Sequence, residues 1–250
     1  MADDRGAAST LKGRLADVFV RALVDGSLAE LSRRLGNRAT IDDPLFGRAS
    51  TLSSIEPLLQ KLSAHFERLG ATYRHVASAT GVERDVSEGV LVVNTKQGVT
   101  ETPIAVVAER RRLREIELRL YYATGSEERK PRVAPRNATA DVAVPQIVAH
   151  VLDGLRKGAV ERVLAAFEES SRLVDPRGTP HAKRDGSLAS FVSRLTGRLA
   201  LVPTGAADDG RHCFVEAAVM REGDDAELAA FTFERGDSGL LREIRCYYEP

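Results

Sequence analysis

The 250-residue chain lacks a net charge, because its 36 Lys and Arg residues balance its 36 Asp and Glu residues. No overall field would therefore draw it onto nucleic acid or an anionic membrane. It also lacks an apolar run of the roughly 20 residues needed to span a bilayer, and its polar start does not resemble a secretion signal. We expect a cytoplasmic protein that binds neither nucleic acid nor membrane.

Cysteine is scarce, since only Cys213 and Cys246 are present, and both fall in segments with a strand pattern. A thiol in such a segment behaves as a small buried apolar group, so we expect free thiols in a reducing compartment. The five histidines have no metal-ligand spacing, and the chain has no glycine-rich phosphate loop and no G-x-S-x-G motif. The sequence thus predicts neither a metal nor a cofactor.

One segment occurs twice, first at residues 113–122 and again at 241–248. Both copies alternate apolar and charged residues with the period of two that a β-strand requires. This repeat indicates that the chain is a tandem duplication. The polar face of each copy has the same composition, namely Glu117, Arg119 and Tyr121 in the first and Glu243, Arg245 and Tyr247 in the second.

The two halves also share an order of elements: three helices, a short strand that stops at Asp-Pro, and four successive strands. The Asp-Pro pairs are Asp43-Pro44 and Asp175-Pro176, where proline removes a ladder donor. Residues 125–141 carry proline and charge without an apolar period, as a linker does. We therefore predict a first domain over residues 11–124 and a second over 142–250.

This order resembles the nuclear transport factor two-like superfamily, and within it the SnoaL-like branch and its bacterial two-domain members. The resemblance implies an α+β fold of two cone-shaped barrels, each a curved antiparallel sheet wrapped over three helices. It also implies an apolar cavity open at one end of each barrel. Single-domain relatives pair sheet to sheet, so we expect an intramolecular pseudo-dimer within a monomer, with opposite charges meeting between the two polar strand faces.

Candidate site residues follow from that cavity. Tyr122 and Tyr248 end the apolar face of each final strand, where they either close the barrel or extend a hydroxyl into it. SnoaL-like cyclases carry a catalytic acid just beyond this strand, which implies Glu249 in the second copy, whereas the first copy has Ala123. Glu249 is penultimate in the chain, and an unordered end is the alternative.

Asp43 and Asp175 precede proline, where a carboxylate either closes a turn or stands at a cavity mouth. His181 lies in a basic loop near the expected opening of the second barrel. His75 lies on a strand, as a base or as a satisfied edge residue. We take Glu249, Tyr248 and Asp175 as candidate catalytic residues, and the remaining four as cavity or ligand-binding residues, namely Asp43, His75, Tyr122 and His181.

The leading function is the binding of a small, largely apolar molecule in a barrel cavity. The alternatives are a cyclase or isomerase that works by general acid/base proton transfer, and a non-catalytic scaffold for another protein. The residues do not decide between an enzyme and a binding protein.

Overall fold

The computed structural model describes residues 14–36, 38–81, 83–95, 98–111, 115–124, 142–195, 200–220 and 226–247. The predicted linker at 125–141 lies outside the described residues, and the domain limits 11–124 and 142–250 stay predictions. Among the helices of the described ranges, none combines the length and the apolar composition that a bilayer crossing needs.

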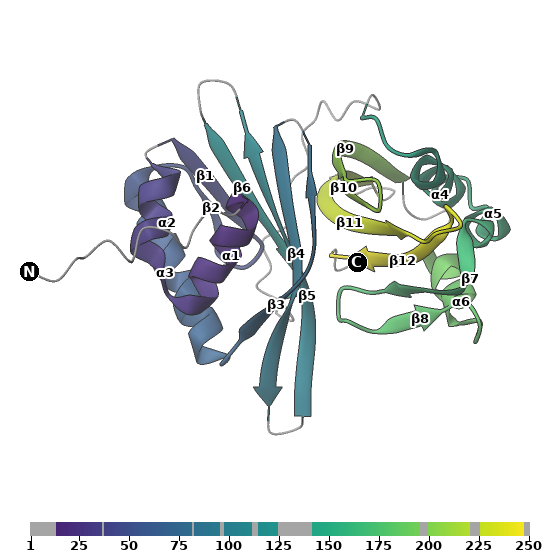
Figure 1. Ribbon diagram of the computed structural model, residues 1–250, viewed down its shortest axis with the longest axis horizontal. Coiled ribbons are helices and arrows are strands. Elements are labelled where there is room, and N and C mark those ends of the chain that lie inside the picture. Colours follow the sequence, from purple (N-terminus) through teal and green to yellow (C-terminus); the bar gives the residue numbers. More distant parts are fainter. Residues whose placement is uncertain are drawn as a thin grey trace, which may run out of the picture.

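The first half begins with helices that bury one apolar face and continues into a meander (Figure 1). Its elements are α1 (Leu15–Asp25), α2 (Leu28–Leu35), β1 (Ala39–Asp43), β2 (Gly47–Ala49), α3 (Leu52–Arg68), β3 (Thr72–Thr80), β4 (Arg84–Thr95), β5 (Gly98–Arg110) and β6 (Ile116–Tyr122).

The second half repeats this order. Its elements are α4 (Gln146–Arg156), α5 (Val160–Ala165), β7 (Phe167–Val174), β8 (Pro180–Ala182), α6 (Ser187–Leu195), β9 (Ala200–Asp208), β10 (His212–Met220), β11 (Glu227–Arg235) and β12 (Leu241–Cys246).

Both halves form the same sheet, in the order β2-β1-β6-β5-β4-β3 and β8-β7-β12-β11-β10-β9. The predicted tandem α+β fold is therefore confirmed. The sheets are mixed rather than wholly antiparallel, because β1 pairs with β6, and β7 with β12, in parallel. The long connection from the short strand to the last one allows this direction. The short strands β2 and β8 are additional to the predicted order, and His181 lies on β8 rather than in a loop.

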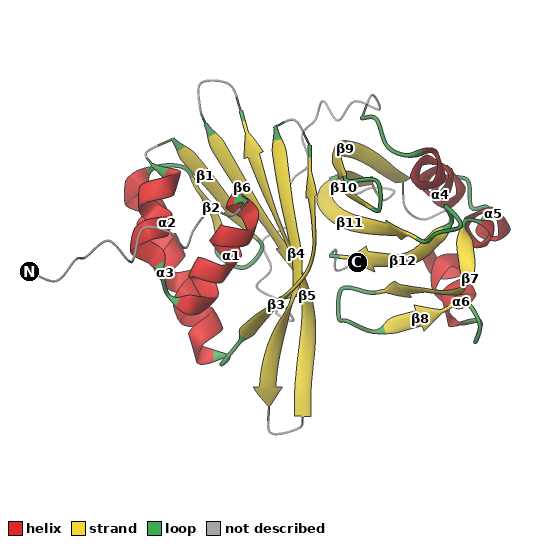
Figure 2. Ribbon diagram, viewed as in Figure 1, coloured by secondary structure: helices red, strands yellow, loops and turns green. Residues whose placement is uncertain are grey.

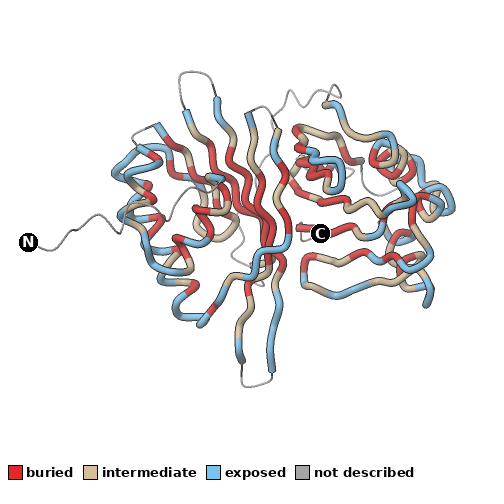
Figure 3. Tube along the Cα trace, viewed as in Figure 1, coloured by how far each residue is buried: buried red, intermediate tan, exposed pale blue. Residues whose placement is uncertain are grey.

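The helices lie on the outer sides of the molecule and the two sheets face each other in the middle (Figure 2). Each half has its own apolar core between its sheet and its helices. A third apolar cluster lies between the sheets, with side chains from both halves, and buried residues concentrate there (Figure 3). Its aromatic members include Tyr121, Phe214 and Tyr247. This middle layer holds the halves together.

A carboxylate from each half is bound by the other half within this layer. Arg119 donates to both oxygens of Glu216, from Nε to Oε1 at 2.6 Å and from Nη2 to Oε2 at 2.8 Å. The Tyr121 hydroxyl adds a hydrogen bond to Glu216 Oε1 at 2.5 Å. Glu216 is 2% exposed, and its ion pair is bidentate, the geometry that a guanidinium forms best.

The reciprocal contact joins the same residue types in the opposite direction. Arg245 Nε donates to Glu88 Oε2 at 2.7 Å, and the Tyr247 hydroxyl donates to the same oxygen at 2.7 Å. The predicted pseudo-dimer is therefore confirmed, and opposite charges do meet between its sheets. The acidic partners come from β4 and β10, which lie two strands away from β6 and β12 in their own sheets. The glutamates of the repeated segment stay with arginines of their own half.

Burial by itself would raise the pKa of Glu216, but the charge of Arg119, its hydrogen bonds and the charge of Arg84 lower that pKa to about 2. Glu216 is therefore a carboxylate at neutral pH. Arg84 lies with Nη1 3.3 Å from Glu216 Oε2. It crosses β9 at Gly205, where an added Cβ would lie 1.6 Å from the same Nη1 atom. A glycine at this position gives the guanidinium its path to the interface.

We predict that Arg119→Glu lowers the free energy of unfolding by about 3–5 kcal/mol, because it leaves Glu216 buried beside a second carboxylate. With the middle layer weakened, calorimetry should resolve two thermal transitions. The control is Arg74→Glu, the same charge change at a side chain that is 55% exposed, which should keep a single transition. Adding Glu216→Arg to Arg119→Glu should restore part of the loss. One unchanged transition in Arg119→Glu would contradict the proposed dependence.

Candidate functional site

The second half encloses an apolar cavity of about 60 Å³ between its helices and its sheet. A single water needs roughly 10–15 Å³ of such space, so the cavity has room for more than one water-sized group. Apolar side chains supply the lining, and they come from both helical and strand elements: Val151, Leu155, Val163, Phe167, Leu173, Pro176, Phe191, Val192, Leu195, Leu201, Val219, Phe231, Phe233, Ile244 and Cys246.

Asp175 closes the turn that follows β7, beside this cavity. Its Oδ1 accepts the backbone N–H groups of Arg177 and Thr179, each at 2.9 Å. Its backbone N–H donates to the carbonyl of Thr179 at 3.0 Å, and its own carbonyl accepts the N–H of Gly178 at 2.9 Å. These four bonds fix the turn, and they leave Oδ2 for a side chain.

That side chain is His181, whose Nε2 lies 3.3 Å from Asp175 Oδ2. The histidine ring stacks on Phe191, with ring centroids 4.3 Å apart. Phe191 and Pro176 both line the cavity, so the carboxylate and the imidazole lie next to lining residues without lining the cavity themselves. Each of the two side chains is about one sixth exposed, with values of 17% for Asp175 and 15% for His181. The structure thus brings together two of the predicted site residues.

Cys246 connects this pair to the cavity interior, because its side chain lines the cavity and the charge of Asp175 affects the pKa of its thiol. Burial raises the pKa of the Cys246 thiol to about 12, and the charge of Asp175 adds to the rise. The thiol is therefore neutral and contributes an apolar surface.

The corresponding turn of the first half is built differently. Asp43 is fully buried, and its Oδ1 accepts the N–H groups of Leu45 and Phe46 at 2.9 and 2.8 Å. Its Oδ2 accepts the hydroxyl of Tyr122 at 2.9 Å. Tyr122 in turn packs edge-on against Phe66. These contacts close the turn and the barrel, which are the structural roles that the sequence left open for Asp43 and Tyr122.

The register of the short strands shows which residue replaces His181 in the first half. In β7 and β8, Leu173 pairs with His181; in β1 and β2, Ile41 pairs with Ala49. Leu173 and Ile41 each stand two residues before the aspartate of their Asp-Pro pair, so Ala49 occupies the position of His181. The acid and imidazole pair is therefore a feature of the second copy.

The remaining candidates lie elsewhere. His75 is exposed on β3, with Nε2 2.8 Å from the hydroxyl of Ser78, and it is not among the residues that line this cavity. Tyr248 and Glu249 lie outside the described residues, so their catalytic roles stay predictions. Glu88, Arg84 and Glu216 lie at the interface and were not predicted from the sequence. Glu216 could have been found from its pattern, because it is a glutamate within an otherwise apolar strand, Cys213-Phe214-Val215-Glu216-Ala217.

Comparisons with known proteins bear on the fold alone. No protein-family model matches the sequence, and no curated protein matches it. Solved structures match about half of the chain at a time. The orange carotenoid protein of Anabaena (Nostoc), bound to canthaxanthin, is 19% identical with a TM-score of 0.39; the match covers 47% of this chain and 41% of that protein.

Two single-domain structures match similarly. One is a protein from Catenulispora acidiphila with a ketosteroid isomerase-like fold, in complex with trimethylamine. It is 16% identical with a TM-score of 0.36, and the match covers 43% of this chain and 88% of that protein. The other is an NTF2-like protein from Burkholderia pseudomallei. It is also 16% identical with a TM-score of 0.36, and the match covers 42% of this chain and 88% of that protein. Each of these three matches covers less than half of this chain.

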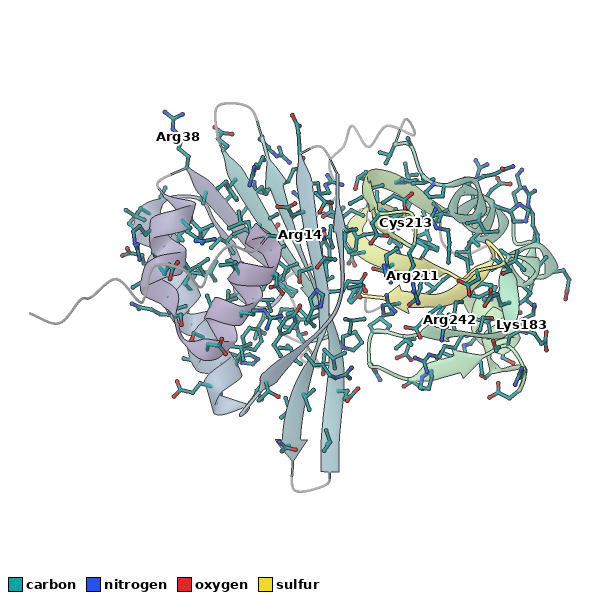
Figure 4. All side chains as sticks on the ribbon, viewed as in Figure 1. Arg14, Arg38, Lys183, Arg211, Cys213 and Arg242 are labelled. Atoms are coloured by element: carbon teal, nitrogen blue, oxygen red, sulfur yellow. The ribbon has the colours of Figure 1, made fainter. Side chains whose placement is uncertain are left out.

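We predict that the two cysteines react at different rates although burial raises the pKa of both to about 12. Cys246 lines the cavity, whereas Cys213 is fully buried. Figure 4 labels Cys213 on the sheet of the second half. Methyl methanethiosulfonate is small and neutral, so it should modify Cys246 about tenfold faster, as mass spectrometry of the digested protein would measure. Equal rates, or a faster Cys213, would contradict an accessible cavity.

Proposed function

We propose that the second barrel binds a small molecule with an apolar body and one hydrogen-bonding group. The observation that carries this proposal is an apolar cavity with a paired carboxylate and imidazole, Asp175 and His181, at its edge. Small-molecule sites combine an apolar lining with a few polar groups that fix the orientation of the ligand. An apolar body would enter the cavity, and its polar group would meet the pair.

The test uses p-cresol and toluene, which share an apolar ring and differ in one hydroxyl. NMR titration of the whole chain should give about tenfold tighter binding of p-cresol, because a hydrogen bond to a charged group contributes about 1.5–3 kcal/mol. His181→Ala, which gives the second half the residue found at position 49, should reduce that preference. Native mass spectrometry of the purified protein tests for a bound natural ligand.

Two variants separate the cavity from general effects on folding. Val219→Phe fills the cavity from β10 and should abolish binding of both probes. Leu91→Phe is the matched control, since Leu91 stands three residues after Glu88, as Val219 does after Glu216, and belongs to the core of the first half. It should leave both affinities unchanged. Failure of the unaltered protein to bind either probe would overturn the proposed function.

The contact between Asp175 and His181 favours a second candidate, an enzyme that removes a proton next to a carbonyl group. In this reading His181 accepts the proton through one ring nitrogen while Asp175 orients the ring through the other. Glu249 and Tyr248 are the further groups to test.

We expect such an enzyme to accelerate exchange of the α-hydrogens of cyclohexanone for deuterium in D2O, followed by proton NMR. His181→Ala should return the exchange to the buffer rate, while Asp175→Asn keeps the turn acceptors and loses the charge that stabilises a protonated ring. Glu249→Gln tests the residue implied by the family. If the unaltered protein exchanges the α-hydrogens at the buffer rate, the enzyme candidate is excluded and ligand binding is the function that stays proposed.

A further inference from the structure

The turn that carries Asp175 touches the first half of the chain at Gly178. A Cβ added to Gly178 would lie 2.6 Å from the backbone oxygen of Glu101 and 3.7 Å from Cδ of Pro103, both on β5. Real Cβ atoms do not approach backbone oxygens so closely, so the turn and β5 are in direct backbone contact. Figure 1 shows the β7–β8 turn facing the long strand β5.

The segment of β5 at this contact extends beyond its partner β6. The ladder between the two strands runs from Ile104 to Arg110, and β6 ends at Tyr122 opposite Ile104. Residues 98–103 continue alongside β4. The turn of the second half lies against this part of β5.

The same turn position differs between the two copies. Counting from each Asp-Pro aspartate, Gly178 corresponds to Phe46. Phe46 packs edge-on against His65 of its own half, with ring centroids 5.8 Å apart. The first half thus covers its turn with its own side chain, whereas the second half has none there and receives a strand of the other half.

We propose that β5 of the first half positions the turn that holds Asp175 in the second half. The contact at Gly178 lies one to three residues from Asp175, Pro176 and Thr179, which set the carboxylate and part of the cavity edge. Displacing the turn would move Asp175 relative to His181. The first half is therefore a positioning partner for the second, and this inference rests on the proposed function only where ligand affinity is concerned.

The experiment compares Gly178→Ala with Gly186→Ala. Both glycines have a left-handed backbone, with φ of +82° and +78°, so both variants carry similar backbone strain. Gly186 has open space around its Cβ position, whereas Gly178 faces β5. We expect Gly178→Ala to weaken p-cresol binding about tenfold more than Gly186→Ala does. It should also shift the ring-proton resonances of His181, because the chemical shifts of these protons depend on the position of the stacked Phe191 ring.

If Gly178→Ala does not fold, the pair Gly178→Asn and Gly186→Asn decides, because asparagine tolerates the left-handed region and isolates the clash with β5. Equal effects of the two positions on both readouts would overturn the inference. If the unaltered protein binds no p-cresol, the proposed function fails. The His181 resonances then still decide whether β5 positions the turn.

Discussion

Two buried carboxylates, each bound by an arginine and a tyrosine of the opposite half, are the constraint on which the rest of this structure depends. Glu216 and Glu88 are each about 2% exposed, and a charge so far from water is tolerated only with a close counter-charge and hydrogen bonds. Arg119 with Tyr121, and Arg245 with Tyr247, provide these across the interface. Among the described residues, each glutamate thus takes its arginine and its tyrosine from the other half. The apolar cluster shared by the two sheets packs in the same layer.

The two copies have kept this interface and diverged at the open ends of their barrels. In the first copy, Asp43 is saturated by two backbone amides and Tyr122, and Phe46 covers the turn. In the second, the equivalent carboxylate has a histidine partner, and a cavity lies behind it. Among the described residues, the acid and imidazole pair beside a cavity is thus found in the second copy, and the longest strand, β5, in the first.

The interface and the cavity are joined through β5. Its residues 104–110 pair with β6, the strand that presents Arg119 and Tyr121 to the middle layer, while the residues before them extend to the turn at Gly178. The same strand therefore takes part both in holding the halves together and in contacting the turn that carries Asp175.

The sequence by itself determined the duplication, the α+β class, the strand faces and the two Asp-Pro turns, because alternation with a period of two and the geometry of proline are local properties. It also indicated that Arg119 and Arg245 would lie at the interface. It did not identify Glu88 and Glu216 as their partners, since a strand period fixes the face of a residue but not the residue opposite it on another sheet. It did not predict the parallel pairing of β1 with β6, which is set by the path of the connecting segments. Only the tertiary structure decided that His181 meets Asp175 beside a cavity, because that meeting depends on how β8, α6 and the turn pack together.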